Sequence, residues 1–113
     1  MHELSITQSI VNIAVDTARK HNVRKVNEIR IRIGAYSGIV SQCVQQYFDI
    51  LSKGTAAEGA VLKMSTIPIT MRCRKCGAEN EIDKLNIRCP DCGSTDLKLL
   101  TGHEFYVESL EVD

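Results

Sequence analysis

The chain has 113 residues, with 14 Lys and Arg against 14 Asp and Glu, and its formal net charge of zero argues against nonspecific binding to nucleic acid or anionic membranes. Hydrophobic residues make up 43% of the composition, which is enough for the core of one modest domain. The first residues mix apolar and polar side chains and form neither a signal peptide nor a transmembrane span, so we expect a soluble, cytoplasmic protein.

An amphipathic helix is predicted over about residues 4–21, because apolar side chains recur there every three or four positions. From Val26 to Ile33, isoleucines alternate with charged residues, which predicts a strand with one buried face. A second, short helix follows, with Ser41 as its expected N-cap and Gly54 as its stop. The apolar face of this helix consists of Val44, Tyr47, Phe48 and Leu51.

Alternation of apolar and polar residues predicts two further strands, over about residues 61–68 and about residues 105–110. The order helix, strand, helix, strand, strand predicts an α+β fold: a small three-stranded mixed sheet with two helices, plus an inserted four-cysteine module of the zinc-ribbon type. We expect residues 1–70 and 101–113 to form the α/β domain and residues 71–100 to form the zinc-binding module.

Four cysteines form two Cys-x-x-Cys-Gly turns, and this spacing can bring four thiolates to the corners of one tetrahedron. Zn²⁺ adopts that geometry with sulfur ligands, so the pattern predicts a zinc site. Two disulfides are one alternative, which the absence of a secretory signal disfavours; sulfur ligands alone also leave iron or an iron–sulfur cluster open. The four predicted ligands are Cys73, Cys76, Cys89 and Cys92.

A site closed by four cysteines leaves no position for water or a substrate, so the predicted zinc supports folding and its removal should unfold the module first. A zinc enzyme would need an open position on the metal. No Gly-Lys-Ser/Thr follows Gly34 or Gly38, so a phosphate-binding loop is not predicted either. The fifth cysteine, Cys43, is expected to be a buried or half-buried helix residue rather than a nucleophile. The sequence therefore predicts no catalytic site.

The second chemical feature is the start of the chain, Met1-His2-Glu3. The α-amine, the deprotonated backbone nitrogen of His2 and its imidazole Nδ1 can bind one metal through adjacent chelate rings, which suits square-planar Ni²⁺ or Cu²⁺. Glu3 can add a carboxylate or a backbone nitrogen. The alternative is an ordinary exposed histidine at a frayed terminus. His21 and His103 are the other histidines that can approach this metal in space.

Several motifs follow one another along the chain: Met1-His2-Glu3-Leu4-Ser5, Arg32-Ile33-Gly34, Ser37-Gly38, Lys53-Gly54-Thr55, Glu58-Gly59-Ala60 and the paired Cys-x-x-Cys-Gly turns. Together they resemble the HypA/HybF family of hydrogenase maturation nickel metallochaperones, and the resemblance covers essentially the whole chain. It implies that Ni²⁺ binds at the N-terminus, with His2 as the principal side-chain ligand and Glu3 contributing. It also implies that the four cysteines carry a structural zinc.

The resemblance further implies partners. In that family nickel passes toward the active site of [NiFe]-hydrogenase, in the large-subunit precursor, with the help of the GTPase HypB, and some members also serve urease maturation. The chain is expected to be a monomer or a homodimer, because an inserted module can be exchanged between two copies. The main alternative is a zinc-ribbon module that contacts protein or RNA without nickel transfer, against which the neutral charge and the α/β domain weigh.

Overall fold

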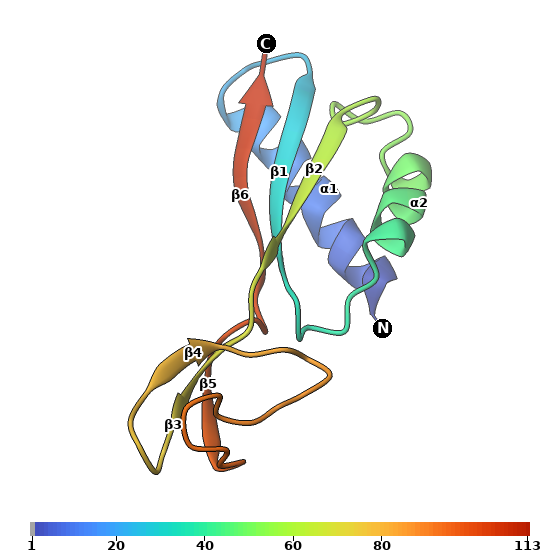
Figure 1. Cartoon of the computed structure of the whole chain (residues 1–113). Coiled ribbons are helices and arrows are strands. Elements are labelled where there is room, and N and C mark those ends of the chain that lie inside the picture. Colours follow the sequence, from blue (N-terminus) through green and yellow to red (C-terminus); the bar gives the residue numbers. More distant parts are fainter. Residues whose placement is uncertain (1) are drawn as a thin grey trace. The chain divides into compact units, whose positions relative to one another are not determined.

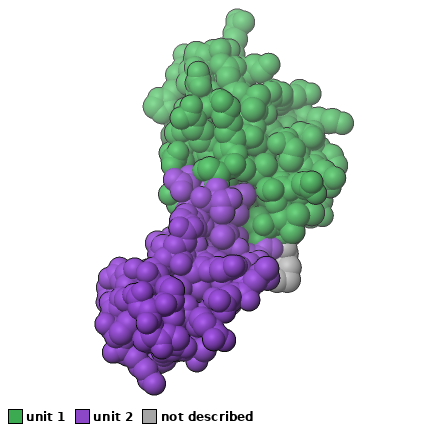
Figure 2. Space-filling model, in the orientation of Figure 1, with its two compact units in different colours: residues 1–31, 39–65, 106–113 green, residues 32–38, 66–105 purple. Residues whose placement is uncertain are grey.

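The computed structural model describes residues 2–113, and the chain divides into two compact units (Figure 2). The first, called the helical unit below, consists of Met1–Ile31, Ile39–Ser65 and Tyr106–Asp113. The second, called the cysteine unit, consists of Arg32–Gly38 and Thr66–Phe105. The cysteine unit therefore includes a short segment that is distant in sequence from the cysteines.

The main sheet has three strands in the order β2-β1-β6 and is accompanied by two helices. β1 and β2 run in the same direction and β6 runs against them, so the sheet is mixed (Figure 1). The predicted α+β architecture of two helices and a small mixed sheet is thus confirmed. The elements are α1 (Glu3–Lys20), β1 (Val26–Gly34), α2 (Ser41–Leu51), β2 (Val61–Ile67) and β6 (Phe105–Val112).

Apolar periodicity explains the core of the helical unit. Ile29 and Ile31 of β1 are fully buried, whereas Arg30 between them is exposed. Burial of a side chain of this size stabilises the fold by about 1.5–3 kcal/mol, so a core of this kind supports folding without a metal. The other buried side chains of this core on the two helices include Thr7, Ile10, Val11, Ala14, Ala18, Val44 and Phe48.

The boundaries of α2 differ from the prediction. Ser41 is the first helical residue instead of the N-cap, which is Val40, and no side chain caps the helix. Val40 has an extended backbone, and it donates its N–H to Oε2 of Glu3 at 3.1 Å. The helix ends at Leu51, before Gly54. Within residues 2–113, no helix is both long and apolar enough to cross a membrane.

The cysteine unit contains a second sheet, which the sequence pattern did not indicate. Its order is β4-β3-β5, and both pairs are antiparallel, with Glu79–Glu81, Thr70–Cys73 and Leu97–Thr101 as the strands. The buried apolar cluster of this unit consists of Ile69, Met71 and Ile82, with Ala35, Leu97 and Leu99 partly buried against it. So small a cluster supplies little stability on its own.

Backbone hydrogen bonds tie the turn after β1 to the rest of the cysteine unit. The N–H of Gly34 donates to the carbonyl of Glu104 at 2.7 Å, and the N–H of Tyr36 donates to the carbonyl of Gly102 at 2.6 Å. A Cβ at Gly34 would collide with the carbonyl of Gly102, and one at Gly102, where φ is 115°, would lie 2.9 Å from Ile69 Cα. Glycine at both positions lets these backbone segments approach one another closely.

Candidate metal centres

The two Cys-x-x-Cys-Gly turns have the same backbone structure. The N–H of Gly77 donates to the carbonyl of Cys73 at 2.9 Å, and the N–H of Gly93 donates to the carbonyl of Cys89 at 2.8 Å. Both glycines have φ of 77°, a left-handed conformation that residues with a Cβ adopt only at a cost. This requirement explains why a glycine follows the second cysteine of each turn.

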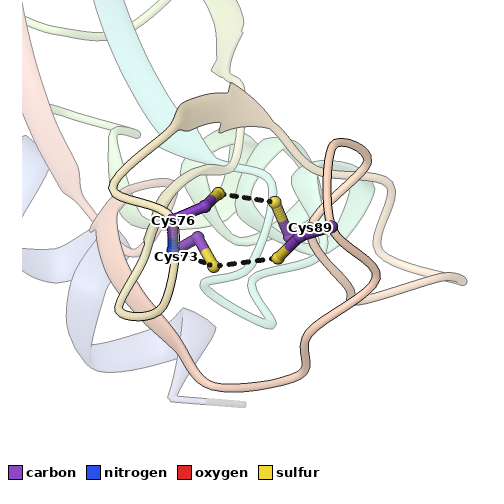
Figure 3. A group of neighbouring side chains, drawn as sticks. Cys73, Cys76 and Cys89 are labelled. Carbon is purple, nitrogen blue, oxygen red and sulfur yellow. Dashed lines mark hydrogen bonds between the residues drawn. The ribbon is translucent and has the colours of Figure 1, made fainter.

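The four sulfurs converge on one point. The Sγ atoms of the four cysteines all lie within 4.8 Å of one another, and Figure 3 shows those of Cys73, Cys76 and Cys89 turned toward a common space. The Cys73–Cys92 and Cys76–Cys89 sulfur pairs are 3.5 and 3.6 Å apart. A tetrahedron of Zn–S bonds of 2.3 Å has sulfurs about 3.8 Å apart, whereas a disulfide bond is about 2.0 Å long. The geometry therefore fits a tetrahedral metal and does not support the disulfide alternative.

The electrostatics of the cluster also favour a bound cation. The N–H of Cys76, 3.4 Å from the sulfur of Cys73, is the main reason that the pKa of Cys73 is lowered to about 6. The pKa of Cys76 is raised to about 12: the N–H of Ala78 lowers it, but the neighbouring thiol of Cys89 and desolvation outweigh that effect. The sulfurs thus resist ionising together, and a divalent cation supplies the charge that four adjacent thiolates need. The donor set fits zinc.

At the other predicted centre, the side chain of His2 is exposed and the residue precedes α1 in a left-handed conformation, with φ of 61°. Its carbonyl accepts hydrogen bonds from the N–H of Ile6 and the hydroxyl of Ser5, both at 3.1 Å. Met1, whose amine is part of the predicted nickel site, lies outside the described residues. The structure therefore describes His2 and Glu3 of this site but not its terminal amine.

Glu3 is the first residue of α1 and is only 9% exposed. Its carboxylate accepts the N–H of Val40, a contact between residues 37 positions apart that no sequence pattern indicated. Its carbonyl accepts the hydroxyl of Thr7, which is fully buried. Glu3 is therefore held in place by the helical unit, whereas the side chain of His2 extends into solvent.

The other predicted residues lie elsewhere. His21 caps the C-terminal end of α1, and the 18 residues of this helix span about 27 Å, so His21 cannot share a metal with His2. Cys43 is half-buried in the first turn of α2, as predicted. Within residues 2–113, the four cysteines are the one group of three or more His, Cys, Asp or Glu side chains placed to hold an ion. His103 belongs to the cysteine unit.

A protein-family model described as hydrogenase/urease nickel incorporation, metallochaperone, HypA matches residues 1–112. The chain belongs to the HypA family. The hydrogenase maturation factor HypA of a Nostoc species is 46% identical over 113 residues, which cover 100% of this chain and 96% of that protein. The hydrogenase maturation factor HypA of Caldanaerobacter subterraneus is 41% identical, and the alignment covers 100% of this chain and 100% of that protein.

Solved structures of HypA proteins have the same fold. The solution structure of the Ni metallochaperone HypA from Helicobacter pylori aligns with a TM-score of 0.69 over 99% of this chain and 97% of that one, at 22% identity. A second HypA solution structure aligns with a TM-score of 0.74, also at 22% identity, over 99% of this chain and 96% of that chain. At this level of identity the structural likeness establishes the fold alone.

Family membership settles the general role. HypA proteins are nickel metallochaperones of hydrogenase maturation and not enzymes, and the family binds nickel and zinc. The four-cysteine cluster fits the structural zinc of this family. Because the family match includes the helices and the main sheet as well as the cysteines, an isolated zinc-ribbon module no longer accounts for the chain.

Proposed function

We propose that this protein binds Ni²⁺ at its N-terminus and delivers it for the maturation of [NiFe]-hydrogenase. The main support is the family match over residues 1–112, which includes the Met1-His2-Glu3 start. The exposed side chain of His2 at the beginning of α1 is compatible with a site that must both take up and release its metal. Residues 1–70 and 101–113 would then form the nickel-binding domain, and residues 71–100 the zinc-binding module.

The proposed ligands are the terminal amine, the backbone nitrogen of His2 and its imidazole Nδ1. The first N–H groups of a helix have no partner in the i to i−4 ladder, so the amide proton of His2 can leave without breaking a helical hydrogen bond. Three nitrogens in adjacent chelate rings favour planar coordination, which suits Ni²⁺ better than the tetrahedral preference of Zn²⁺. The two metals would be distinguished by geometry and by nitrogen against sulfur ligands.

Glu3 contributes a negative charge to the same site. The N-terminus of a helix carries a partial positive charge, which disfavours a cation bound next to it. The Glu3 carboxylate, fixed by its hydrogen bond from Val40, compensates that charge at the first turn of α1. We therefore assign Glu3 a supporting role in nickel binding, by its charge or as a further ligand, with His2 as the principal ligand.

Delivery would require partners that the HypA family implies. A HypB-type GTPase would supply nucleotide hydrolysis, because this sequence has no phosphate-binding loop. The recipient would be the large-subunit precursor of a hydrogenase, and urease maturation proteins are a second class of recipient, since the family description includes urease. Such an exchange would take place in the cytoplasm, between soluble proteins, without nucleic acid or membrane.

The test is a nickel titration of the zinc-loaded protein. We expect it to bind near one Ni²⁺ per chain with release of protons, because amine, amide and imidazole must lose or lack protons to act as ligands. His2→Ala should abolish this binding, and one extra residue before Met1 should change its spectrum, while circular dichroism stays unchanged. His21→Ala, an exposed histidine at the opposite end of α1, is the matched control and should bind nickel normally. Unaltered affinity in both His2→Ala and the extended protein would reject the site.

A further inference from the structure

The four sulfurs of the zinc site differ in their exposure to solvent. Cys73 and Cys89, the first cysteine of each turn, are each 1% exposed. Cys76 and Cys92, the second cysteine of each turn, are exposed. Each turn therefore contributes one buried and one exposed cysteine, so Cys76 and Cys92 are the residues that a reagent in solvent meets first.

The two short sulfur–sulfur contacts join the two turns to each other. Sγ of Cys92 lies 3.5 Å from Sγ of Cys73, and Sγ of Cys76 lies 3.6 Å from Sγ of Cys89. Each contact thus pairs the sulfur of an exposed cysteine in one turn with the sulfur of a buried cysteine in the other. An oxidised sulfur at either exposed position has its resolving partner already beside it.

We propose that the zinc centre is an oxidation site for hydrogen peroxide and similar two-electron peroxides, at which oxidation releases zinc and forms the disulfides Cys73–Cys92 and Cys76–Cys89. The proposed pairing follows the two short sulfur–sulfur contacts between the turns. The Cys-x-x-Cys spacing by itself indicates disulfides within each turn, as in dithiol redox motifs. None of its four cysteines is among the proposed nickel ligands at the N-terminus.

The chemistry needs only the peroxide as oxidant. An exposed thiolate sulfur attacks one peroxide oxygen, the O–O bond breaks, and hydroxide leaves, which gives a sulfenic acid. The buried sulfur across the site then attacks the sulfenic sulfur, the S–O bond breaks, and a second hydroxide leaves. The two sulfurs lose two electrons, the peroxide gains two, and two protons convert both hydroxides to water. A second peroxide forms the second disulfide by the same two steps. With two ligands consumed, the remaining pair no longer encloses the metal.

Disulfides between the turns have a structural consequence. They join the same two turns that four ligands around one zinc ion join, so the oxidised cysteine unit remains closed. Disulfides within the turns would leave the turns free to separate. The proposed oxidation therefore replaces a metal cross-link by a covalent one, and a reductant together with zinc restores the original state.

The experiment uses the full-length, zinc-loaded protein with Cys43→Ser, which removes the one cysteine outside the cluster and leaves all four ligands in place. Limiting hydrogen peroxide is added, zinc release is followed with a chromogenic chelator, and remaining thiols are alkylated. Trypsin cleaves after Arg74 and Lys75, and a protease specific for Asp cleaves before Asp91, so each ligand cysteine ends in a separate peptide. Mass spectrometry then identifies the pairs.

We expect zinc release in proportion to the first disulfide, and linked peptides that join Cys73 to Cys92 or Cys76 to Cys89. Dithiothreitol with added zinc should restore the thiols and the metal content. Disulfides within the turns, sulfinic acids without disulfides, or retention of zinc at equimolar peroxide would each overturn the proposal.

A second measurement needs no oxidant and no change to the ligands. In the zinc-loaded Cys43→Ser protein, a maleimide should label Cys76 and Cys92 at least roughly tenfold faster than Cys73 and Cys89, because exposure controls the access of the reagent. Equal labelling rates at all four cysteines would contradict the difference in exposure on which the attack at Cys76 and Cys92 depends.

Discussion

Ile10, Ile29 and Phe48 of the helical unit are at most 1% exposed and belong to a core that two helices and a sheet enclose. The cysteine unit buries a cluster of only Ile69, Met71 and Ile82. In place of further apolar side chains it buries two of the four sulfurs that fit zinc. The helical unit is thus stabilised by hydrophobic burial, and the cysteine unit by its metal.

Because their sources of stability differ, the two units should respond to different perturbations. Loss of metal removes the cross-link of one unit and leaves the other's core intact, and a cavity in the core does the reverse. The strands β1, β2 and β6 extend from one unit into the other. If the two units nevertheless respond separately, their stability is local in spite of the continuous backbone.

Removal of zinc should have the largest effect. Structural zinc contributes on the order of 10–16 kcal/mol in zinc-finger peptides, far more than the small apolar cluster of the cysteine unit can supply. On chelation at neutral pH we expect amide exchange of β3 and β5 to become as fast as in an unfolded chain. The amides of Ile29 and Ile31 in β1 should remain protected. Loss of protection in both places at once would show that the two units unfold as one.

A cavity in the helical unit should have the next largest effect. Phe48 is 1% exposed, and Phe48→Ala should destabilise the unit by about 3–5 kcal/mol, measured by urea unfolding and far-UV circular dichroism. Its neighbour Tyr47 is 37% exposed, so Tyr47→Ala is the matched control and should cost less than about 1 kcal/mol. Zinc content should be unchanged in both variants. A loss of zinc in Phe48→Ala alone would mean that the core also supports the metal site.

A side chain at the crowded backbone contact of the cysteine unit should have an intermediate effect. Gly102→Ala places a Cβ 2.9 Å from Cα of Ile69 at a φ of 115°, so strain and overlap together should cost roughly 2–4 kcal/mol. Gly38→Ala is the control in the same unit, because φ is 77° there but no atom lies within 4 Å of the added Cβ. It should cost only about 1 kcal/mol, from the backbone alone. Thermal unfolding of the zinc-loaded proteins measures both, and equal losses would contradict the close approach.

The helical unit was largely predictable from the sequence, because its elements are long and their apolar residues are periodic. The helix expected over residues 4–21 is α1, Glu3–Lys20, and the strand expected from Val26 to Ile33 is β1, Val26–Gly34. The cysteine unit was less predictable. Its strands are three to five residues long, too short for alternation to stand out, so the second sheet was missed.

The candidate sites show the same limit. The spacing of the four cysteines was enough to predict that they form one site, because they lie in two local turns whose geometry depends on glycine. Contacts between residues distant in sequence could not be predicted, because no sequence pattern indicates them. The hydrogen bond from Val40 to Glu3, the approach of Gly34 to Gly102 and the burial of one sulfur in each turn all depend on the folded chain.

The smallest expected effect concerns charge on the main sheet. Glu28 of β1 lies 2.8 Å from Arg30 Nε and 3.2 Å from Lys63 Nζ, and these two cations, Arg30 foremost, lower the pKa of the Glu28 carboxyl. The folded state therefore holds the Glu28 proton less tightly than the unfolded state, in which the pKa is about 4.3. The resulting stabilisation is complete above that value and is lost as the pH falls through the lowered pKa.

Glu28→Gln should accordingly weaken the loss of the helical unit's stability as the pH falls below about 4.3. The effect should be small and should shrink in high salt, because Arg30 and Lys63 are 54% and 60% exposed and solvent screens their charges. Exchange of β1 amides is the appropriate measurement, since acid also protonates the thiolates of the cysteine unit. Asp16→Asn, which removes a pair with Arg19 whose side chains are 58% and 74% exposed, should leave the pH dependence nearly unchanged. An equal acid response in wild type and Glu28→Gln would show that the ion pairs of Glu28 with Arg30 and Lys63 contribute no pH-dependent stability.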